Sequence, residues 1–173
     1  MSYNNAAINE SPTISELAGA AMTSPAMKAV KYDSSGNIVF ATAGALVAGL
    51  LLPSAEDSVA SGDRVDVQIK DIGLWIAGAA VAKGAELASD ANGKAVTAAA
   101  GDFIAAIALE AASAAGKVIK VQIVKLGYKP ADLSTLTLGD LADVDLSTAP
   151  TDNQILKYVA ADNKFKPAAD ATA

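Results

Sequence analysis

The feature that most constrains this chain is strict alternation of apolar and polar residues over short runs. In the run from residue 64 to 71, the apolar side chains are Val65, Val67 and Ile69, and a polar residue follows each of them. A period of two puts the apolar set on one face of a β-strand. The run therefore predicts a strand that is buried on one side.

Further short runs are separated by turn residues along the middle of the chain. Met27–Tyr32 and Ile38–Ala41 flank a turn that contains Gly36, which predicts a hairpin. Asn92-Gly93 predicts a second hairpin, with a type I′ turn. Residues 47–52, 103–109 and 118–124 read as further strands. We expect a mainly all-β fold, a compact antiparallel β-barrel or sandwich of short strands.

The core candidates are the apolar residues of these runs. Trp75 lies between Leu74 and Ile76, and a tryptophan in such a strand is more often core than an exposed binding aromatic. The predicted core residues are Val65, Val67, Ile69, Trp75, Ile119, Val121 and Ile123.

The two ends of the chain lack the regular strand pattern of the middle. Residues 1–25 predict an N-terminal arm, in which Ser15–Met22 could form a short helical turn against a partner, so removing them should leave the β domain folded. Residues 26–128 form the predicted β domain, and residues 129–173 a C-terminal linker and fibre-like segment. Ala41–Leu52 is too short for a membrane span and reads as a buried strand pair. The first residues lack a secretory signal, which favours synthesis in the cytoplasm.

Composition limits the partners. Apolar residues make up 52% of the chain but aromatic residues only 5%, so a monomer buries little surface per residue and oligomerisation is expected. The net charge is −6 and the pI is about 4.5, without a cluster of Lys and Arg. Phosphate backbones require such clusters, so we expect no nucleic-acid partner, and no membrane partner either.

The chain lacks the residues of common catalytic sites. It contains neither histidine nor cysteine, which excludes the usual nucleophile pairs and the commonest metal ligands. Gly116-Lys117 lacks the rest of a phosphate loop, and the Asp90–Lys94 segment fails calcium-loop spacing. We therefore predict no catalytic residue, no cofactor and no metal, and an enzyme of unfamiliar type is the least favoured hypothesis.

Two stretches carry a resemblance to phage proteins. Lys83-Gly84, Gly93, Ala105–Glu110 and Gly116–Val121 occupy the places of a pattern found in a small β domain of tailed-phage capsid decoration and head-fibre proteins. That pattern usually has a glycine where this chain has Ala105 or Ala106.

The C-terminal stretch resembles an element of phage fibres, with Asn153 in place of its glycine and Phe165 in place of its tryptophan. The matching positions are Asp143-Val144, Pro150, Gln154, Leu156, Tyr158 and Pro167. The resemblance implies a homotrimer on the capsid lattice, with the β domain as base and the tail projecting or pairing subunits. Leu156, Tyr158 and Phe165 are then the candidate oligomer interface.

The leading hypothesis is thus a structural virion protein of a bacteriophage that binds the major capsid protein on the capsid exterior. It would stabilise the shell or present a projection, with the N-terminal arm or the domain rim as the capsid contact. The alternative is a host-surface adhesin or receptor-binding fibre module with a ligand on the cell surface. The scarcity of Trp and Tyr in the expected loops disfavours that alternative.

Overall fold

The computed structural model describes residues 12–53, 55–130, 137–152 and 154–169. The chain divides into two compact units, Met1–Ala131 and Asp132–Ala173, and each is described by itself. None of the helices in the described part of the chain is both long and apolar enough to cross a membrane.

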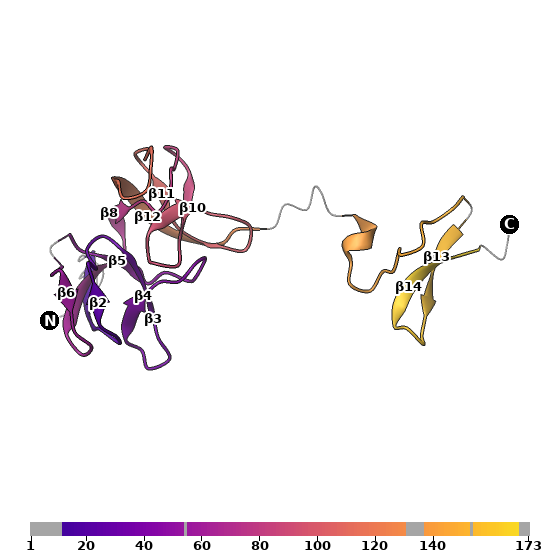
Figure 1. Ribbon diagram of the computed structural model, residues 1–173, viewed down its shortest axis with the longest axis horizontal. Helices are drawn as coiled ribbons and strands as arrows, with labels where there is room; N and C mark the ends of the chain where they lie inside the picture. The colour runs from indigo at the N-terminus through magenta and orange to yellow at the C-terminus, as the bar shows by residue number, and fades with distance from the viewer. Residues whose placement is uncertain (1–11, 54, 131–136, 153, 170–173) are drawn as a thin grey trace, which may run out of the picture. The chain divides into compact units, whose positions relative to one another are not determined.

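Two five-stranded sheets make up most of the first unit (Figure 1), and their paired strands run antiparallel. This confirms the predicted all-β class in its sandwich form, since no ladder of paired strands joins the two edges of either sheet into a closed barrel. The first sheet has the order β1 (Thr13–Leu17), β7 (Arg64–Gln68), β5 (Gly49–Leu51), β3 (Ala29–Tyr32), β4 (Ile38–Phe40). The second has the order β10 (Ala95–Thr97), β9 (Glu86–Ser89), β11 (Phe103–Ala108), β12 (Val118–Tyr128), β8 (Asp71–Ile76). β2 (Met22–Thr23) and β6 (Ser58–Val59) form a small separate sheet.

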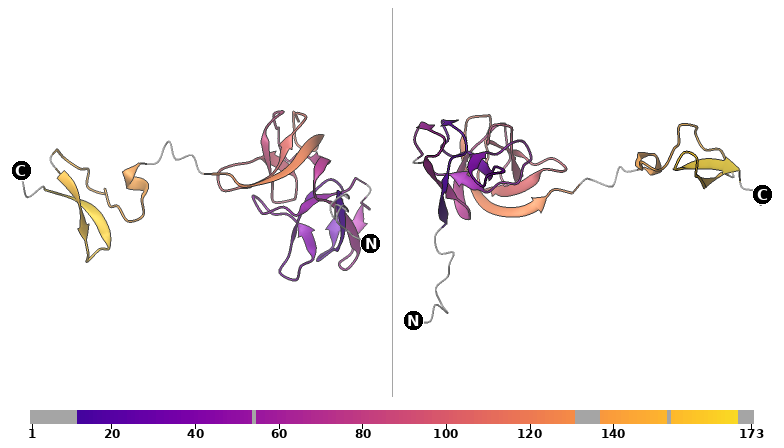
Figure 2. Two further views of the ribbon diagram at one scale, coloured as in Figure 1. Left: turned by 180° about the vertical axis from the view of Figure 1, so that it is seen from behind. Right: turned by 90° about the horizontal axis from the view of Figure 1, so that it is seen from below.

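The two large sheets have the same connectivity. In chain order, β1, β3, β4, β5 and β7 pair with one another in the pattern of β8, β9, β10, β11 and β12. We call residues 13–69 the first repeat and residues 71–128 the second repeat; they appear as two neighbouring lobes in Figures 1 and 2. An isolated bridge joins the two edges of each sheet at equivalent places, Ala18 with Ile38 and Ala77 with Ala95.

The sequence repeats where the structure does. The first repeat contains Ala18-Gly19-Ala20-Ala21, Asp33 with Gly36, and Val67-Gln68-Ile69; the second contains Ala77-Gly78-Ala79-Ala80, Asp90 with Gly93, and Val121-Gln122-Ile123. The turns are built alike as well. Asp33 Oδ1 accepts bonds from the amides of Ser35 and Asn37, and Asp90 Oδ1 accepts them from Asn92 and Lys94. The first unit therefore has an internally duplicated fold.

Each repeat has its own apolar cluster, and the second cluster extends into the first repeat. Residues of the first repeat that join it are Ala29, Ala41, Val47 and Leu50. They pack with Trp75 and Phe103 of the second repeat, among others. This contact between the repeats, which we call the seam, enlarges the cluster of the second repeat.

A backbone carbonyl organises the seam. The oxygen of Gly93 accepts a bond of 2.9 Å from Trp75 Nε1 and one of 2.6 Å from the amide of Ala29. Trp75 is fully buried, so its indole N–H needs this partner. The amide of Ile76 also donates to the oxygen of Met27 across the seam.

The structure corrects several sequence expectations. The hairpin between β3 and β4 and the one at Asn92-Gly93 are confirmed, but only Gly93 of that pair has a positive φ, so the turn is not type I′. Ala41–Leu52 was expected to be a strand pair, yet it holds the single strand β5. Ala43, Gly44 and Ala45 lie in a turn there instead, in which the amide of Ala45 donates to the oxygen of Thr42.

The N-terminal segment differs most from expectation. β1 pairs along its whole length with β7, and β2 pairs with β6, so Thr13–Leu17 and Met22–Thr23 are strands rather than parts of an arm or a helical turn. Met22 is almost completely buried in the first cluster, which anchors this stretch. Residues 1–11 of the predicted arm lie outside the described residues.

The second unit contains one β-hairpin, β13 (Gln154–Val159) with β14 (Lys164–Ala169), and a 3₁₀ turn at Leu138–Asp140. Val144 forms a parallel bridge with Phe165, and the chain on either side of Val144 exchanges backbone bonds with Phe165. Residues 143–145 therefore extend the hairpin at the edge of β14.

We predict that Gly93→Ala destabilises the first unit more than Gly36→Ala. The two glycines are equivalent and both have a positive φ, which costs a residue with a Cβ about 1–2 kcal/mol. A Cβ at Gly93 would also lie 2.7 Å from the oxygen of Ala29, whereas nothing lies within 4 Å of one at Gly36. Urea denaturation of both variants measures the difference; equal losses would contradict the role of the seam.

Removing residues 1–25 should lower the melting temperature and broaden the transition, which reverses the expectation from sequence. The deletion takes away β1, β2 and the buried side chains of Ala18 and Met22. Losing a single buried methionine side chain already costs about 2–5 kcal/mol. Calorimetry compares this deletion with one of residues 1–11, which keeps both strands. An unchanged, cooperative transition in the longer deletion would prove this prediction wrong.

Candidate functional site

The described residues offer surfaces rather than a reaction centre. None of them form a group of three or more side chains suited to hold a metal ion. Ser89 is the one polar residue among those classed as buried, and its hydroxyl donates to the oxygen of Asp90. The titratable side chains of the described residues are not among the buried ones.

The predicted core residues lie in both repeats. Ile69 is only partly buried and packs at the margin of the first cluster. The others are buried: Val65, Val67, Trp75, Ile119, Val121 and Ile123. Val65 and Val67 belong to the cluster of the first repeat, and the last four belong to the cluster that includes the seam.

The three residues predicted as an oligomer interface lie on one face of the C-terminal hairpin. Tyr158 pairs with Phe165 across the strands, with ring centroids 5.3 Å apart, and Leu156 pairs with Pro167. Side chains two residues apart share a face of a strand, so all four point the same way. The exposed fractions of Leu156, Tyr158 and Phe165 are 37%, 49% and 38%. We call these four residues the hairpin face.

A shallow groove of about 200 Å³ adjoins this face. Leu138 and Ile155, which help to line it, are about half exposed. Val144 is the one buried hydrophobic residue among those described in this unit. The second unit thus leaves most of its large apolar side chains in contact with water.

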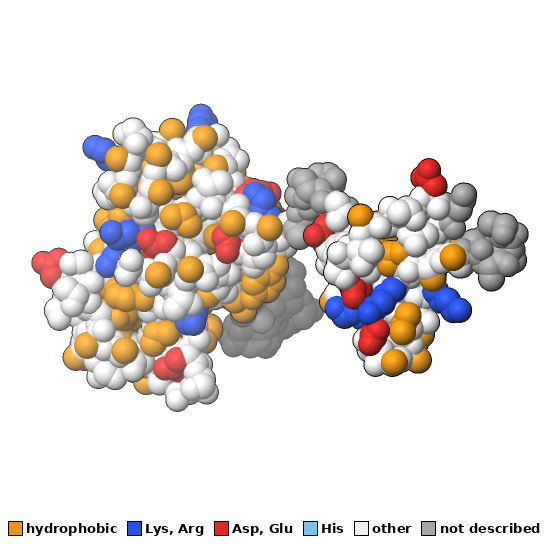
Figure 3. Space-filling model, turned by 45° about the vertical axis from the view of Figure 1, so that its right-hand side comes forward, with side chains coloured by type: hydrophobic (Ala, Val, Ile, Leu, Met, Phe, Trp, Pro, Cys, Tyr) orange, Lys and Arg blue, Asp and Glu red, His pale blue; other side chains and the backbone are white. Residues whose placement is uncertain are grey.

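Charged groups hold the back of the hairpin together. Lys166 Nζ lies 2.7 Å from a carboxylate oxygen of Asp162 and 3.4 Å from one of Asp145. Figure 3 shows such blue and red side chains next to each other on this unit. Hydrogen bonds from Ser147, together with Lys166, lower the pKa of Asp145 to about 2. Bonds to Asp162 and Asp145 raise the pKa of Lys166.

A larger groove, of about 460 Å³, lies in the first repeat. Carboxylates dominate its charge, and it contains one arginine. Its lining residues are Leu52, Ala55, Glu56, Val59, Asp63, Arg64, Val65 and Asp66. Reasoning from the sequence missed this groove, because its walls come from a loop and a strand that only the fold brings together.

Reasoning from the sequence also missed the duplication. The repeated Ala-Gly-Ala-Ala and Val-Gln-Ile strings were the available signal. They were hidden by the changing spacing between equivalent residues and by the different side chains at outward positions, such as Asp66 and Lys120.

Comparisons with known proteins agree with these features. A family model described as phage cement protein matches residues 27–123, more than half of the 173-residue chain. No curated protein gives a significant match. The crystal structure of the head fibre gp8.5 N base of bacteriophage phi29 is similar in fold, with a TM-score of 0.50 and 19% identity; the match covers 69% of this chain and 98% of that one.

The second unit should lose structure as the pH falls from about 4 towards 2. The pKa of Asp145 is lower in the folded chain than its ordinary value of 3.8, so the stability it provides is present above pH 3.8 and is lost as the carboxylate is protonated. The amide NMR signals of residues 143–145 and 165 report this transition. Asp145→Asn should reduce its pH dependence, although Asp140, whose pKa is lowered by hydrogen bonds from Thr137, keeps a part of it. A variant that follows the wild-type profile would contradict the assignment.

Proposed function

Because the chain belongs to the phage cement protein family, we propose that it decorates the outer surface of a phage capsid as a homotrimer whose C-terminal unit joins the subunits. As a member of that family it is a structural, non-enzymatic protein of the virion that binds the capsid. Family membership does not establish the trimer or the separate roles of the two units, and these are our proposals.

The mechanism we propose for stabilisation is mass action. A protein that binds the assembled shell but not dissociated coat subunits lowers the free energy of the assembled state by RT ln(1 + [L]/Kd). No catalytic group is required for this effect. Surface contacts suffice, and the described chain has its titratable side chains on surfaces.

The observation that carries self-association is the exposed hairpin face. A two-stranded hairpin alone is only marginally stable in water. Here Leu156, Tyr158 and Phe165 stay partly exposed, while residues 143–145 cover only the edge of β14. Burial of the hairpin face against other copies would remove apolar surface from water and stabilise the unit.

We propose a different role for each of the two units. The first unit would be the base that binds the major capsid protein, and the second would project from it or pair subunits. The fold likeness to the phi29 head fibre base supports this, since that base is matched over 98% of its length by 69% of this chain. The rest of this chain lies outside the match to that base.

The adhesin alternative has less support. Sugar recognition commonly uses aromatic rings displayed for stacking. In the described part of the chain, the exposed aromatic residues are Tyr32, Tyr128, Tyr158 and Phe165, and all four lie in strands rather than in loops.

Purified chain added to shells that lack it should bind saturably and raise the temperature at which the shells dissociate. Co-sedimentation measures the binding, and light scattering during heating measures the stabilisation. Free coat subunits serve as the control and should not bind. A chain that binds neither intact shells nor fragments of the lattice would overturn the proposed function.

Replacing Leu156 and Tyr158 by serine should weaken the trimer, so that light scattering across a dilution series finds it dissociating at higher concentrations than the wild type. The matched control is Lys157→Ser with Lys164→Ser, on the opposite side of the same hairpin. Because the first unit has its own core, its melting should change little. A double serine variant whose trimer resists dilution as well as the wild type would show that the hairpin face does not join the subunits.

A further inference from the structure

The two repeats carry opposite charges at equivalent outward positions. β7 and β12 share their inward residues, for example Val67 and Val121. Outward, Asp63 and Asp66 of the first repeat correspond to Lys117 and Lys120 of the second. The fold constrains the inward residues through packing, but it does not require a reversal of charge at the surface.

On the first repeat, the acidic residues line the groove described above. Its apolar lining residues are Leu52, Val59 and Val65; Val59 and Val65 are buried in the core of the first repeat, and Leu52 is the partly exposed one. Its acidic rim is formed by Glu56, Asp63 and Asp66, with Arg64 as the one cation among the lining residues. Asp63 also accepts a bond from the amide of Ala60, which fixes the turn at one end of the groove without neutralising the carboxylate.

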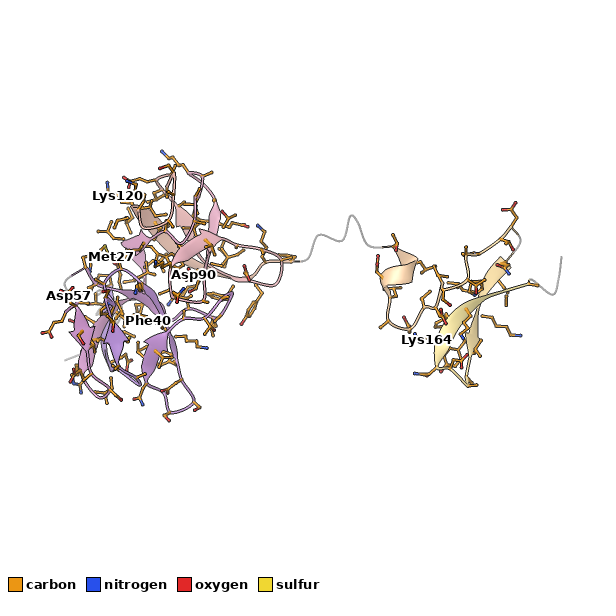
Figure 4. All side chains as sticks on the ribbon, viewed as in Figure 1. Met27, Phe40, Asp57, Asp90, Lys120 and Lys164 are labelled. Atoms are coloured by element: carbon orange, nitrogen blue, oxygen red, sulfur yellow. The ribbon has the colours of Figure 1, made fainter. Side chains whose placement is uncertain are left out.

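On the second repeat, the equivalent strand presents an apolar residue between two lysines. Val118 is 45% exposed, and Lys117 and Lys120 flank it. Lys120 forms an ion pair of 3.1 Å with Glu110, and both side chains remain largely exposed. Figure 4 labels Lys120 on the second repeat, and it labels Asp57, the neighbour of Glu56, on the first.

We propose that the acidic groove of one copy binds Lys117–Lys120 of a second copy. Val118 would meet Leu52 in the groove, and the two lysines would meet its acidic rim. Among the described residues no ion pair joins these two surfaces, and the ion pair of Lys120 with Glu110 leaves both of those side chains about half exposed. The complementarity between groove and strand in charge and in apolar character identifies the partner as another copy of this chain.

Such a contact is heterologous, because one copy contributes its groove and the other contributes its Lys117–Lys120 strand. Heterologous contacts close into rings when the rotation between copies permits it. The inference goes beyond the pairing proposed for the C-terminal unit: it adds a second contact between subunits, in the first unit.

The test is a charge exchange in the full-length chain. Glu56→Lys with Asp66→Lys makes the groove basic, and Lys117→Glu with Lys120→Glu makes the strand acidic. Each pair alone should weaken self-association by at least about ten-fold at low salt, because like charges then face each other. All four substitutions together should restore it. Sedimentation velocity across a concentration series measures the association.

Lys70→Glu with Lys157→Glu is the matched control, since it changes the net charge as much as the strand variant and neither lysine belongs to the groove or to the Lys117–Lys120 strand. Circular dichroism establishes that each variant is folded. Association that is insensitive to either pair, or not restored by the combination, would overturn the proposal. Variants that assemble like the wild type but no longer bind shells would also overturn the proposal, because the two surfaces would then belong to the capsid contact. A wild-type chain that does not bind shells would instead refute the proposed function.

A second measurement tests the contact if the charge-exchange variants do not fold. The chain has no cysteine, so single cysteines can be introduced without background. An oxidised mixture of Asp66→Cys and Lys117→Cys chains should yield mixed dimers in excess over dimers of either variant alone. Statistical mixing, or no cross-link between folded chains, would contradict the contact.

Discussion

The first unit depends on the hydrogen bonds that converge on the oxygen of Gly93. Trp75 is the largest side chain in the core, and its burial is tolerable only because this oxygen accepts its indole N–H. The same oxygen binds the amide of Ala29 in the other repeat, so one peptide group fixes both the tryptophan and the seam. A Cβ at position 93 would come within 2.7 Å of the carbonyl oxygen of Ala29, which explains why the close approach requires glycine.

The seam explains how a chain with few aromatic residues obtains a core. The cluster of the first repeat contains small and medium side chains such as Ala18, Val30 and Val65. Each such residue removes little surface from water, so a single repeat would be thinly stabilised. The second cluster avoids this limit because Val47 and Leu50 of the first repeat complete it. The described residues of the C-terminal unit form no counterpart of the seam, and most of their large apolar side chains stay exposed.

The sequence predicted what depends on local patterns. Alternation located β7, the Asp33 and Asn92-Gly93 segments located two hairpins, and apolar parity located Val65, Trp75 and Val121. The sequence-based predictions failed where pairing between strands that are distant in the sequence determines the structure. β1 reads as a polar arm because its side chains are mostly half-exposed at a sheet edge, and only pairing with β7 makes it a strand. The groove beside Asp66 could not be foreseen either: its lining residues all lie between positions 52 and 66, but the path of the loop that connects β5 to β7 decides which of them face one another.

Duplication bears on function through the different constraints on inward and outward positions. Inward residues such as Val67 and Val121 must fill the same space in both repeats, so they can change little without leaving a cavity or a clash. Outward residues such as Asp66 and Lys120 meet no such demand and can diverge without affecting the fold. A duplicated domain can therefore present two different surfaces on one scaffold. For a capsid cement protein this is useful, because a subunit that holds a lattice together needs separate surfaces for the shell and for its neighbours.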